Sequence, residues 1–193
     1  MNILKKLQFN RLQKRLHKLH KFYESEGSDS RLKPLIQAFY AMAEFYEKHR
    51  SDKDLPYSEY HALECYRVVA SFGDAKAQYL LAERLLNYGK FWEGIARNPL
   101  YKTNKPKAYA QSFFEESRVY LQAADEQGYP LARRLLGMAH IHGWGNSPNL
   151  EKGYQLVLES IDLEQGWAKA TQIFDTLQLN SPEFFSALRA YKG

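Results

Sequence analysis

The chain has 193 residues, of which 45% are hydrophobic and 15% aromatic, a composition that favours a packed core and excludes a disordered chain. Its one cysteine, Cys65, excludes an intramolecular disulfide and a cysteine-cluster metal site. Residues 1–20 are basic without the apolar centre of a secretory signal, and no apolar run approaches the roughly 18 residues of a membrane span. We therefore expect a cytoplasmic protein.

Positive charge is concentrated in the first 21 residues. This segment holds no acid, so the other 172 residues carry −2 of the total net charge of +5. A nucleic-acid-binding domain more often spreads its basic residues over its main body, so this distribution disfavours nucleic acid as a partner. The basic residues of the segment are Lys5, Lys6, Arg11, Lys14, Arg15, Lys18 and Lys21.

The first predicted helix spans residues 3–23 and carries one apolar stripe on an otherwise basic surface. Two interpretations stay open. The stripe packs on the next helix while the lysines face solvent, or the helix is a basic amphipathic surface for acidic lipids, nucleic acid or an acidic patch of a partner. The stripe follows a 3-4-3-4 spacing through Phe9, Leu12, Leu16, Leu19 and Tyr23.

Three more helices are expected in the first half of the chain. A polar turn at 24–30 offers Asp29 or Ser30 as a cap for the second helix, and Ser58 is a start signal for the third. Short turns between helices predict antiparallel neighbours. The predicted helices span residues 31–50, 59–71 and, after the turn at Gly73, 75–88.

An internal repeat emerges when three turn glycines are aligned. Each glycine is expected to end a helix in the left-handed conformation, with a small residue four positions later that lets two helices cross closely. The intervals between glycines are 55 and 38 residues, which predicts an insertion at residues 90–106. The aligned sets are Gly73, Ala77 and Leu81; Gly128, Ala132 and Leu136; and Gly166, Ala170 and Phe174.

The middle copy, residues 123–153, resembles the Sel-like repeat family, a relative of the tetratricopeptide repeat. It departs from the family pattern at His140, where Tyr is usual, and at Gly153, where Ala is usual. The first copy keeps Gly73, Ala75, Ala77 and Ala82, and the third keeps Gly166, Ala168 and Ala170. The matching residues of the middle copy are Ala123, Ala124, Gly128, Ala132, Leu136, Gly137, Gly143, Gly145, Asn149 and Lys152.

This resemblance implies an all-α fold, a right-handed α/α solenoid of about four antiparallel helix pairs with a C-terminal capping helix. It covers residues 57–178 within a single helical-repeat domain of residues 1–193, between a basic N-terminal helix pair at 1–56 and a cap at 179–193. Such repeats imply non-enzymatic protein–protein adaptors, often bacterial and linked to secretion, envelope or signalling assemblies.

The C-terminal segment carries a strong helix start at Ser181, Pro182 and Glu183. Phe184 and Phe185 begin the apolar side of this helix, which continues through Leu188 and Tyr191. A solenoid needs a cap over its last repeat, so we expect this helix to be that cap, with a partner-binding tail as the alternative.

The predicted partner-binding residues lie in the insertion and on the first helices of the repeats. The insertion holds four apolar anchors, including Ile95, and we weigh a loop that packs over the repeats, a loop that contacts a partner, and disorder. Aromatic side chains at the starts of first helices suit recognition by large, rigid contacts. The predicted contact residues are Tyr60, His61, Phe91, Trp92, Tyr101, Tyr109 and Phe113.

No pattern predicts catalysis, a cofactor or a metal. His140 and His142 are two residues apart and face different sides of a helix, and the pair His17 and His20 has no carboxylate close in sequence. Cys65 lies on an apolar face, as a small core residue does. We therefore expect an adaptor that binds a protein or peptide, or alternatively a module that binds an anionic membrane or nucleic acid through residues 1–21.

Overall fold

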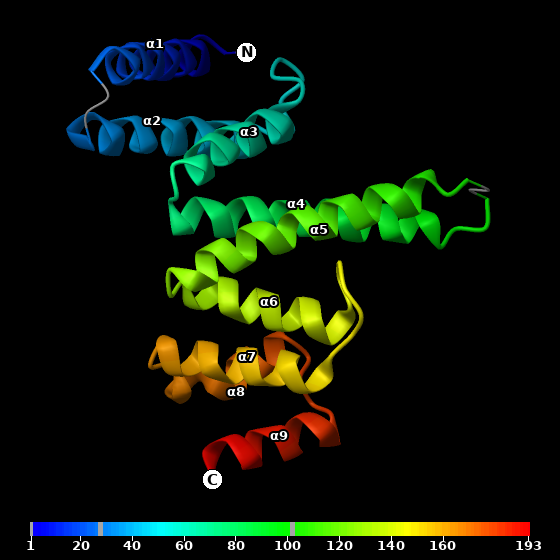
Figure 1. The fold of residues 1–193 in the computed structure, drawn as a ribbon. Coiled ribbons are helices and arrows are strands. Elements are labelled where there is room, and N and C mark those ends of the chain that lie inside the picture. The colour runs from blue at the N-terminus through cyan, green and yellow to red at the C-terminus, as the bar shows by residue number, and fades with distance from the viewer. Residues whose placement is uncertain (1, 27–28, 101–102) are drawn as a thin grey trace. The chain divides into compact units, whose positions relative to one another are not determined.

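The computed structural model describes residues 2–26, 29–100 and 103–193, and this part of the chain is helical with no strand (Figure 1). The prediction of an all-α fold is therefore confirmed. The chain divides into two compact units, Met1–Ala77 and Gln78–Gly193, each of which is described by itself. Among the described residues, no helix is both long and apolar enough to cross a membrane.

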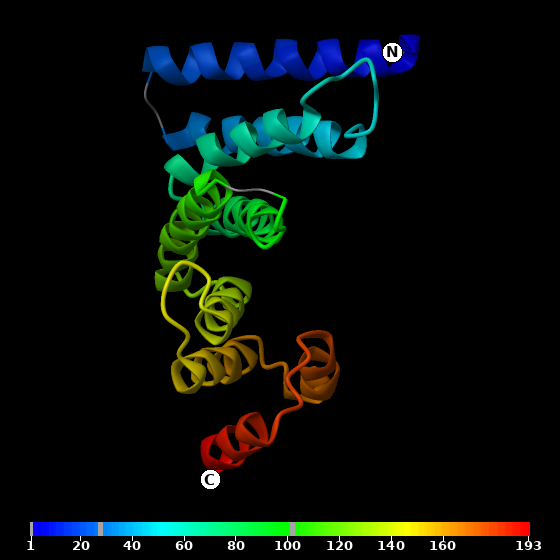
Figure 2. The same cartoon turned by 90° about the vertical axis from the view of Figure 1, so that its right-hand side faces the viewer.

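In the first unit, α1 (Ile3–Glu26) lies along α2 (Asp29–Lys48), as Figures 1 and 2 show. The predicted stripe of α1 is the face that α2 covers, and all five of its residues are half-buried. Phe9 packs against Phe45 and Tyr46, with ring centroids 5.5 and 6.0 Å apart. The prediction that the stripe packs on the next helix is confirmed.

The turn after α3 (Ser58–Ser71) is fixed by a side-chain cap. Gly73 has φ +84°, as predicted for a helix end. The Asp74 carboxylate then accepts the Ala77 amide at 2.8 Å and the Tyr40 hydroxyl at 2.5 Å. The cap therefore joins the start of α4 to α2 within the first unit.

The predicted helix end at Tyr88 is wrong, because α4 (Ala75–Ala96) continues for eight more residues. Gly89 lies inside this longer helix and allows close approach of α5 (Lys105–Glu126), since a Cβ there would lie 2.4 Å from the Phe114 ring. Residues 90–96 and 105–106 of the predicted insertion are thus helix. In Figure 1, α4 and α5 extend side by side as a long hairpin.

Two glycines set the crossing of α6 (Pro130–His142) and α7 (Leu150–Leu163). A Cβ on Gly137 would lie 2.7 Å from the Gly153 carbonyl oxygen, and a Cβ on Gly153 would lie 2.8 Å from the Gly137 carbonyl oxygen. Gly153 departs from the family pattern, yet it is half of this contact. The two backbones meet with no room for a side chain.

The turn after α6 also touches the hairpin. Gly145 has φ +74°, and a Cβ there would lie 3.0 Å from the backbone of Phe114. Between the two turn glycines, the Trp144 ring faces the Phe114 ring, with centroids 6.4 Å apart, and Lys90 lies 3.8 Å from the Trp144 centroid. The second turn glycine is therefore needed for close approach as well as for chain reversal.

The chain ends with η1 (Trp167–Lys169), α8 (Ala170–Thr176) and α9 (Pro182–Lys192). The prediction of a left-handed Gly166 is wrong: its φ is −91°, and the preceding Gln165 takes φ +50°. The Ser181 start signal is confirmed, because its hydroxyl accepts the Phe184 amide at 3.2 Å. Phe184 is fully buried and makes edge contacts with Tyr154 of α7.

Replacing Gly137 by alanine tests the α6–α7 crossing. We expect Gly137→Ala to lower the free energy of unfolding by about 1–3 kcal/mol, because the new methyl group overlaps backbone that cannot rotate away. All three tryptophans lie in the second unit, so urea unfolding followed by tryptophan fluorescence reports on it.

The matched control is Gly94→Ala. Gly94 lies inside α4 with nothing within 4 Å of its Cβ position. We expect this variant to gain about 0.5–1 kcal/mol from the higher helix propensity of alanine. Equal stabilisation of both variants would contradict the close crossing.

Candidate interaction sites

Three of the predicted contact residues form one exposed group, the hairpin aromatic cluster of Phe91, Trp92 and Tyr109. The Trp92 ring lies 5.6 Å from the Phe91 ring and 5.0 Å from the Tyr109 ring. Phe91 is 60% exposed and Tyr109 is 49% exposed. Trp92 is half-buried and packs on a small core that contains Leu86 and Phe114. The cluster is thus an exposed surface held by one anchored ring.

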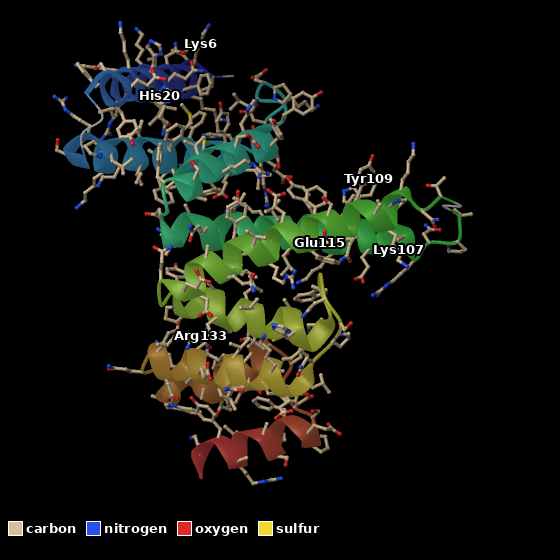
Figure 3. All side chains as sticks on the ribbon, in the orientation of Figure 1. Lys6, His20, Lys107, Tyr109, Glu115 and Arg133 are labelled. Atoms are coloured by element: carbon tan, nitrogen blue, oxygen red, sulfur yellow. The ribbon has the colours of Figure 1, made fainter. Side chains whose placement is uncertain are left out.

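The surroundings of the cluster mix apolar and basic side chains. Leu100, at the tip of the hairpin, is 83% exposed. Figure 3 shows Tyr109 and Lys107 leaving α5 in opposite directions. Glu93 pairs with Arg97 at 3.1 Å across one helical turn. The predicted contact residue Tyr101 lies outside the described residues.

The other predicted contacts lie elsewhere. Phe113 is half-buried against Tyr88, with centroids 5.5 Å apart, further along the same two helices. Tyr60 and His61 belong to α3 in the first unit, where Tyr60 is 57% exposed. His61 stacks on Tyr46 with centroids 5.1 Å apart. The binding role of all these residues stays a prediction.

A groove of about 550 Å³ opens in the first unit, and we name it the α1–α3 groove. Its floor comes from α2 and its walls come from α1 and α3. Sequence reasoning missed it, although Gln13, His17 and His20 follow helical spacing on the side of α1 next to the apolar stripe. The lining residues are Gln13, Leu16, His17, His20, Phe39, Met42, Tyr46, His61, Glu64, Cys65 and Val68.

The basic residues of α1 face away from its buried stripe. Lys5 is the exception, because its ammonium pairs with the Asp52 carboxylate at 2.9 Å. That hydrogen bond holds the pKa of Asp52 below its ordinary value. The exposed remainder of the predicted basic surface is Lys6, Arg11, Lys14, Arg15, Lys18 and Lys21.

A second groove, of about 650 Å³, lies between α7 and α9. Leu150, Tyr154 and Ala187 give it an apolar lining, and Glu151 and Glu183 stand at its edge. The pKa of Glu183 is lowered by backbone hydrogen bonding and by Ser181 at the helix start. This groove has an acidic rim where the α1–α3 groove has a basic helix for a wall.

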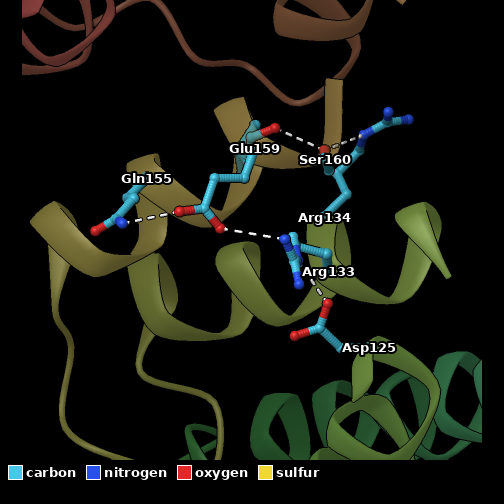
Figure 4. A network of polar contacts seen from close by, with 7 residues as sticks. Asp125, Arg133, Arg134, Gln155, Glu159 and Ser160 are labelled. Carbon is cyan, nitrogen blue, oxygen red and sulfur yellow. Dashed lines mark hydrogen bonds and ion pairs between the residues drawn. The ribbon is translucent and has the colours of Figure 1, made fainter. Parts of the chain in front are cut away.

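A polar network ties α5, α6 and α7 together (Figure 4). Arg133 of α6 pairs with Asp125 of α5 at 2.6 Å and with Glu159 of α7 at 3.4 Å. Arg134 donates to the Ser160 hydroxyl at 3.2 Å and pairs with Glu164. Each arginine meets a carboxylate, so the network suits a structural clamp rather than an anion site.

The histidines of the middle repeat are held by neighbours. His140 Nδ1 lies 2.8 Å from the Asn146 amide nitrogen, and His142 stacks on Trp144 with centroids 4.5 Å apart. Burial lowers the pKa of both imidazoles below the ordinary value, which favours their neutral forms. Within the described ranges, no three His, Cys, Asp or Glu side chains are grouped to hold a metal. The absence of catalysis stays a prediction.

Comparison with known proteins adds no family. No protein-family model matches the chain, and no curated protein matches its sequence. In the part of the chain that the structure describes, the fold and the sites define a class only: a helical protein in which neighbouring helices pack together, with an exposed aromatic cluster on the hairpin and open grooves that include the two described above.

Chemical labelling of Cys65 tests the packing of the first unit. Burial raises the pKa of this thiol from 9.0 to about 12, so native Cys65 holds about a thousandth of the thiolate of a free cysteine at neutral pH. We expect iodoacetamide at pH 8 to label it only after unfolding in urea. Because the pKa is raised in the folded state, its contribution to stability is present below pH 9 and is lost between pH 9 and 12. Rapid labelling of the native protein would contradict this packing.

Proposed function

We propose that the protein is a non-enzymatic scaffold that binds other proteins through the hairpin aromatic cluster. One observation carries this proposal: Phe91 and Tyr109 remain largely exposed beside the anchored ring of Trp92. Exposed aromatic groups of this kind mark interaction surfaces, because each ring buries a large area with few rotatable bonds. The anchored centre lowers the entropy that binding must remove.

The Sel-like resemblance supports the same function. Two glycines that match the repeat, Gly137 and Gly145, lie at close contacts with neighbouring backbone. We propose that the helices form a right-handed solenoid of about four helix pairs, closed by α9. The proposal extends to a cytoplasmic bacterial protein that belongs to a larger assembly, such as a secretion or envelope system.

Replacing the exposed rings tests the proposed contact surface. We expect Phe91→Ala and Tyr109→Ala each to raise the Kd for the native partner about 30-fold, as loss of a hot spot of about 2 kcal/mol does. Stability should change by less than about 0.5 kcal/mol, because neither ring is buried. The partner is first captured from the native host and identified by mass spectrometry. Its Kd is then measured with purified proteins by calorimetry.

The matched control is Phe185→Ala in α9, a ring that is 44% exposed away from the hairpin. It should bind the partner with unchanged Kd. Trp92→Ala is a poorer test, since it also removes packing from the core around Phe114. Normal binding by both hairpin variants would refute the site.

A second candidate function rests on the exposed basic face of α1. We propose that this face attaches the protein electrostatically to an anionic membrane, with nucleic acid as the alternative ligand. The apolar stripe of α1 already packs on α2, as the contact of Phe9 with Phe45 illustrates, so the stripe is not free to insert into lipid. The apolar side chains that α1 does expose are Ile3, Leu4, Leu7 and Phe22. Attachment would rely on about 1 kcal/mol per basic residue near the surface, a contribution that salt screens.

Vesicle sedimentation separates this candidate from a protein scaffold. With vesicles of phosphatidylcholine and phosphatidylglycerol, α1 predicts binding at about 20 mM salt that disappears near 200 mM. Lys14→Glu combined with Lys18→Glu should abolish it, whereas Lys105→Glu combined with Lys107→Glu should not. Binding that survives high salt would mean apolar insertion and would contradict purely electrostatic attachment.

A further inference from the structure

We propose that the α1–α3 groove binds an acidic amphipathic helical segment of a partner protein. The proposal rests on the scaffold function, and it names a second contact site made of residues of the first unit. The groove volume, about 550 Å³, is within the range of about 300–1,000 Å³ found for ligand sites.

The floor of the groove is apolar and already formed. Phe39 and Met42 of the floor and Cys65 at the base of the α3 wall each expose less than a tenth of their surface. The methionine side chain adapts its shape to different apolar partners. Large aliphatic or aromatic side chains of a partner therefore have a prepared surface to cover.

The walls of the groove present imidazole rings from two helices. His17 and His20 come from α1, and His61 comes from α3. His20 meets Phe39 edge-on at 6.5 Å, and His61 stacks on Tyr46 at 5.1 Å, so both rings are supported from below. Imidazole N–H groups are donors for carboxylates. Glu64 is the acid of the lining, and Arg67 lies 3.3 Å from it.

The positive charge of α1 favours a partner segment with negative charge. α1 carries six exposed cations, and residues 1–21 contain no acid. None of these cations lines the groove itself. Lys14 and Lys21 are three and four residues from His17, so they share its side of the helix. A one-sign surface beside a groove speeds the encounter with an opposite charge and rejects like charge.

The shape of the site favours a peptide helix over a membrane. The buried floor of Phe39 and Met42 is recessed between two helices, where a flat bilayer does not reach. A helix docks in such a groove with apolar residues at i, i+3 or i+4, and i+7. Its outer face then carries the acids that meet the lysines of α1.

Selection from a library of random displayed peptides on the full-length protein tests the proposal. We expect the enriched peptides to be net acidic, with apolar residues at helical spacing. For one enriched peptide, Lys14→Glu combined with Lys21→Glu should weaken binding at least about tenfold by fluorescence anisotropy. His61→Glu should do the same. The control, Lys105→Glu combined with Lys107→Glu, makes the same charge change on the hairpin and should leave binding unchanged.

Selection of no peptide, or of peptides without acids, would overturn the proposal, as would binding that the hairpin charge control abolishes. A single-stranded oligonucleotide that binds the unaltered protein more tightly than the enriched peptides, and loses binding in the same Lys14→Glu and Lys21→Glu variant, would assign the groove to nucleic acid instead. Phe91→Ala combined with Tyr109→Ala should leave peptide binding intact. A failure of the hairpin site is therefore distinguishable from a failure of the groove.

Discussion

The crossing of α6 and α7 at Gly137 and Gly153 is the constraint on which the second unit depends. Each glycine occupies the space that a Cβ on the other would need, so the two backbones touch. Protein interiors are close-packed, and a contact this short fixes how everything around it fits. Val157 packs beside the crossing, and at its edge Arg133 spans from α5 to α7 because the helices are held near one another.

Local sequence signals predicted much of this architecture. The stripe of α1, the turn at Gly73 and the cap at Ser181 depend on residues within a turn or two of one another. The length of α4 was not predictable in this way, because α4 packs against a distant segment: the Phe114 ring, 25 residues after Gly89, fills the space beside that glycine. In the third turn, the left-handed residue is Gln165 and not the predicted Gly166. The sequence of the turn itself does not explain this difference.

The two candidate sites differ in how well the sequence predicted them. The sequence predicted contact residues in this region from its aromatic side chains, which include Phe91, Trp92 and Tyr109. These three rings lie together because α4 and α5 run side by side along the hairpin. The α1–α3 groove combines residues from three helices, so no single stretch of the sequence predicts it. Both candidate sites involve segments outside the aligned glycine-containing copies: the hairpin of α4 and α5, and the basic helix α1.

The central claim is that the hairpin aromatic cluster touches a protein partner. Photo-cross-linking in the native host tests this most directly, with a photoreactive phenylalanine analogue placed at position 91 or, for comparison, at position 185. The account predicts cross-links to one protein partner from position 91 and none to that partner from position 185. Cross-links to that partner from position 185 alone would contradict it.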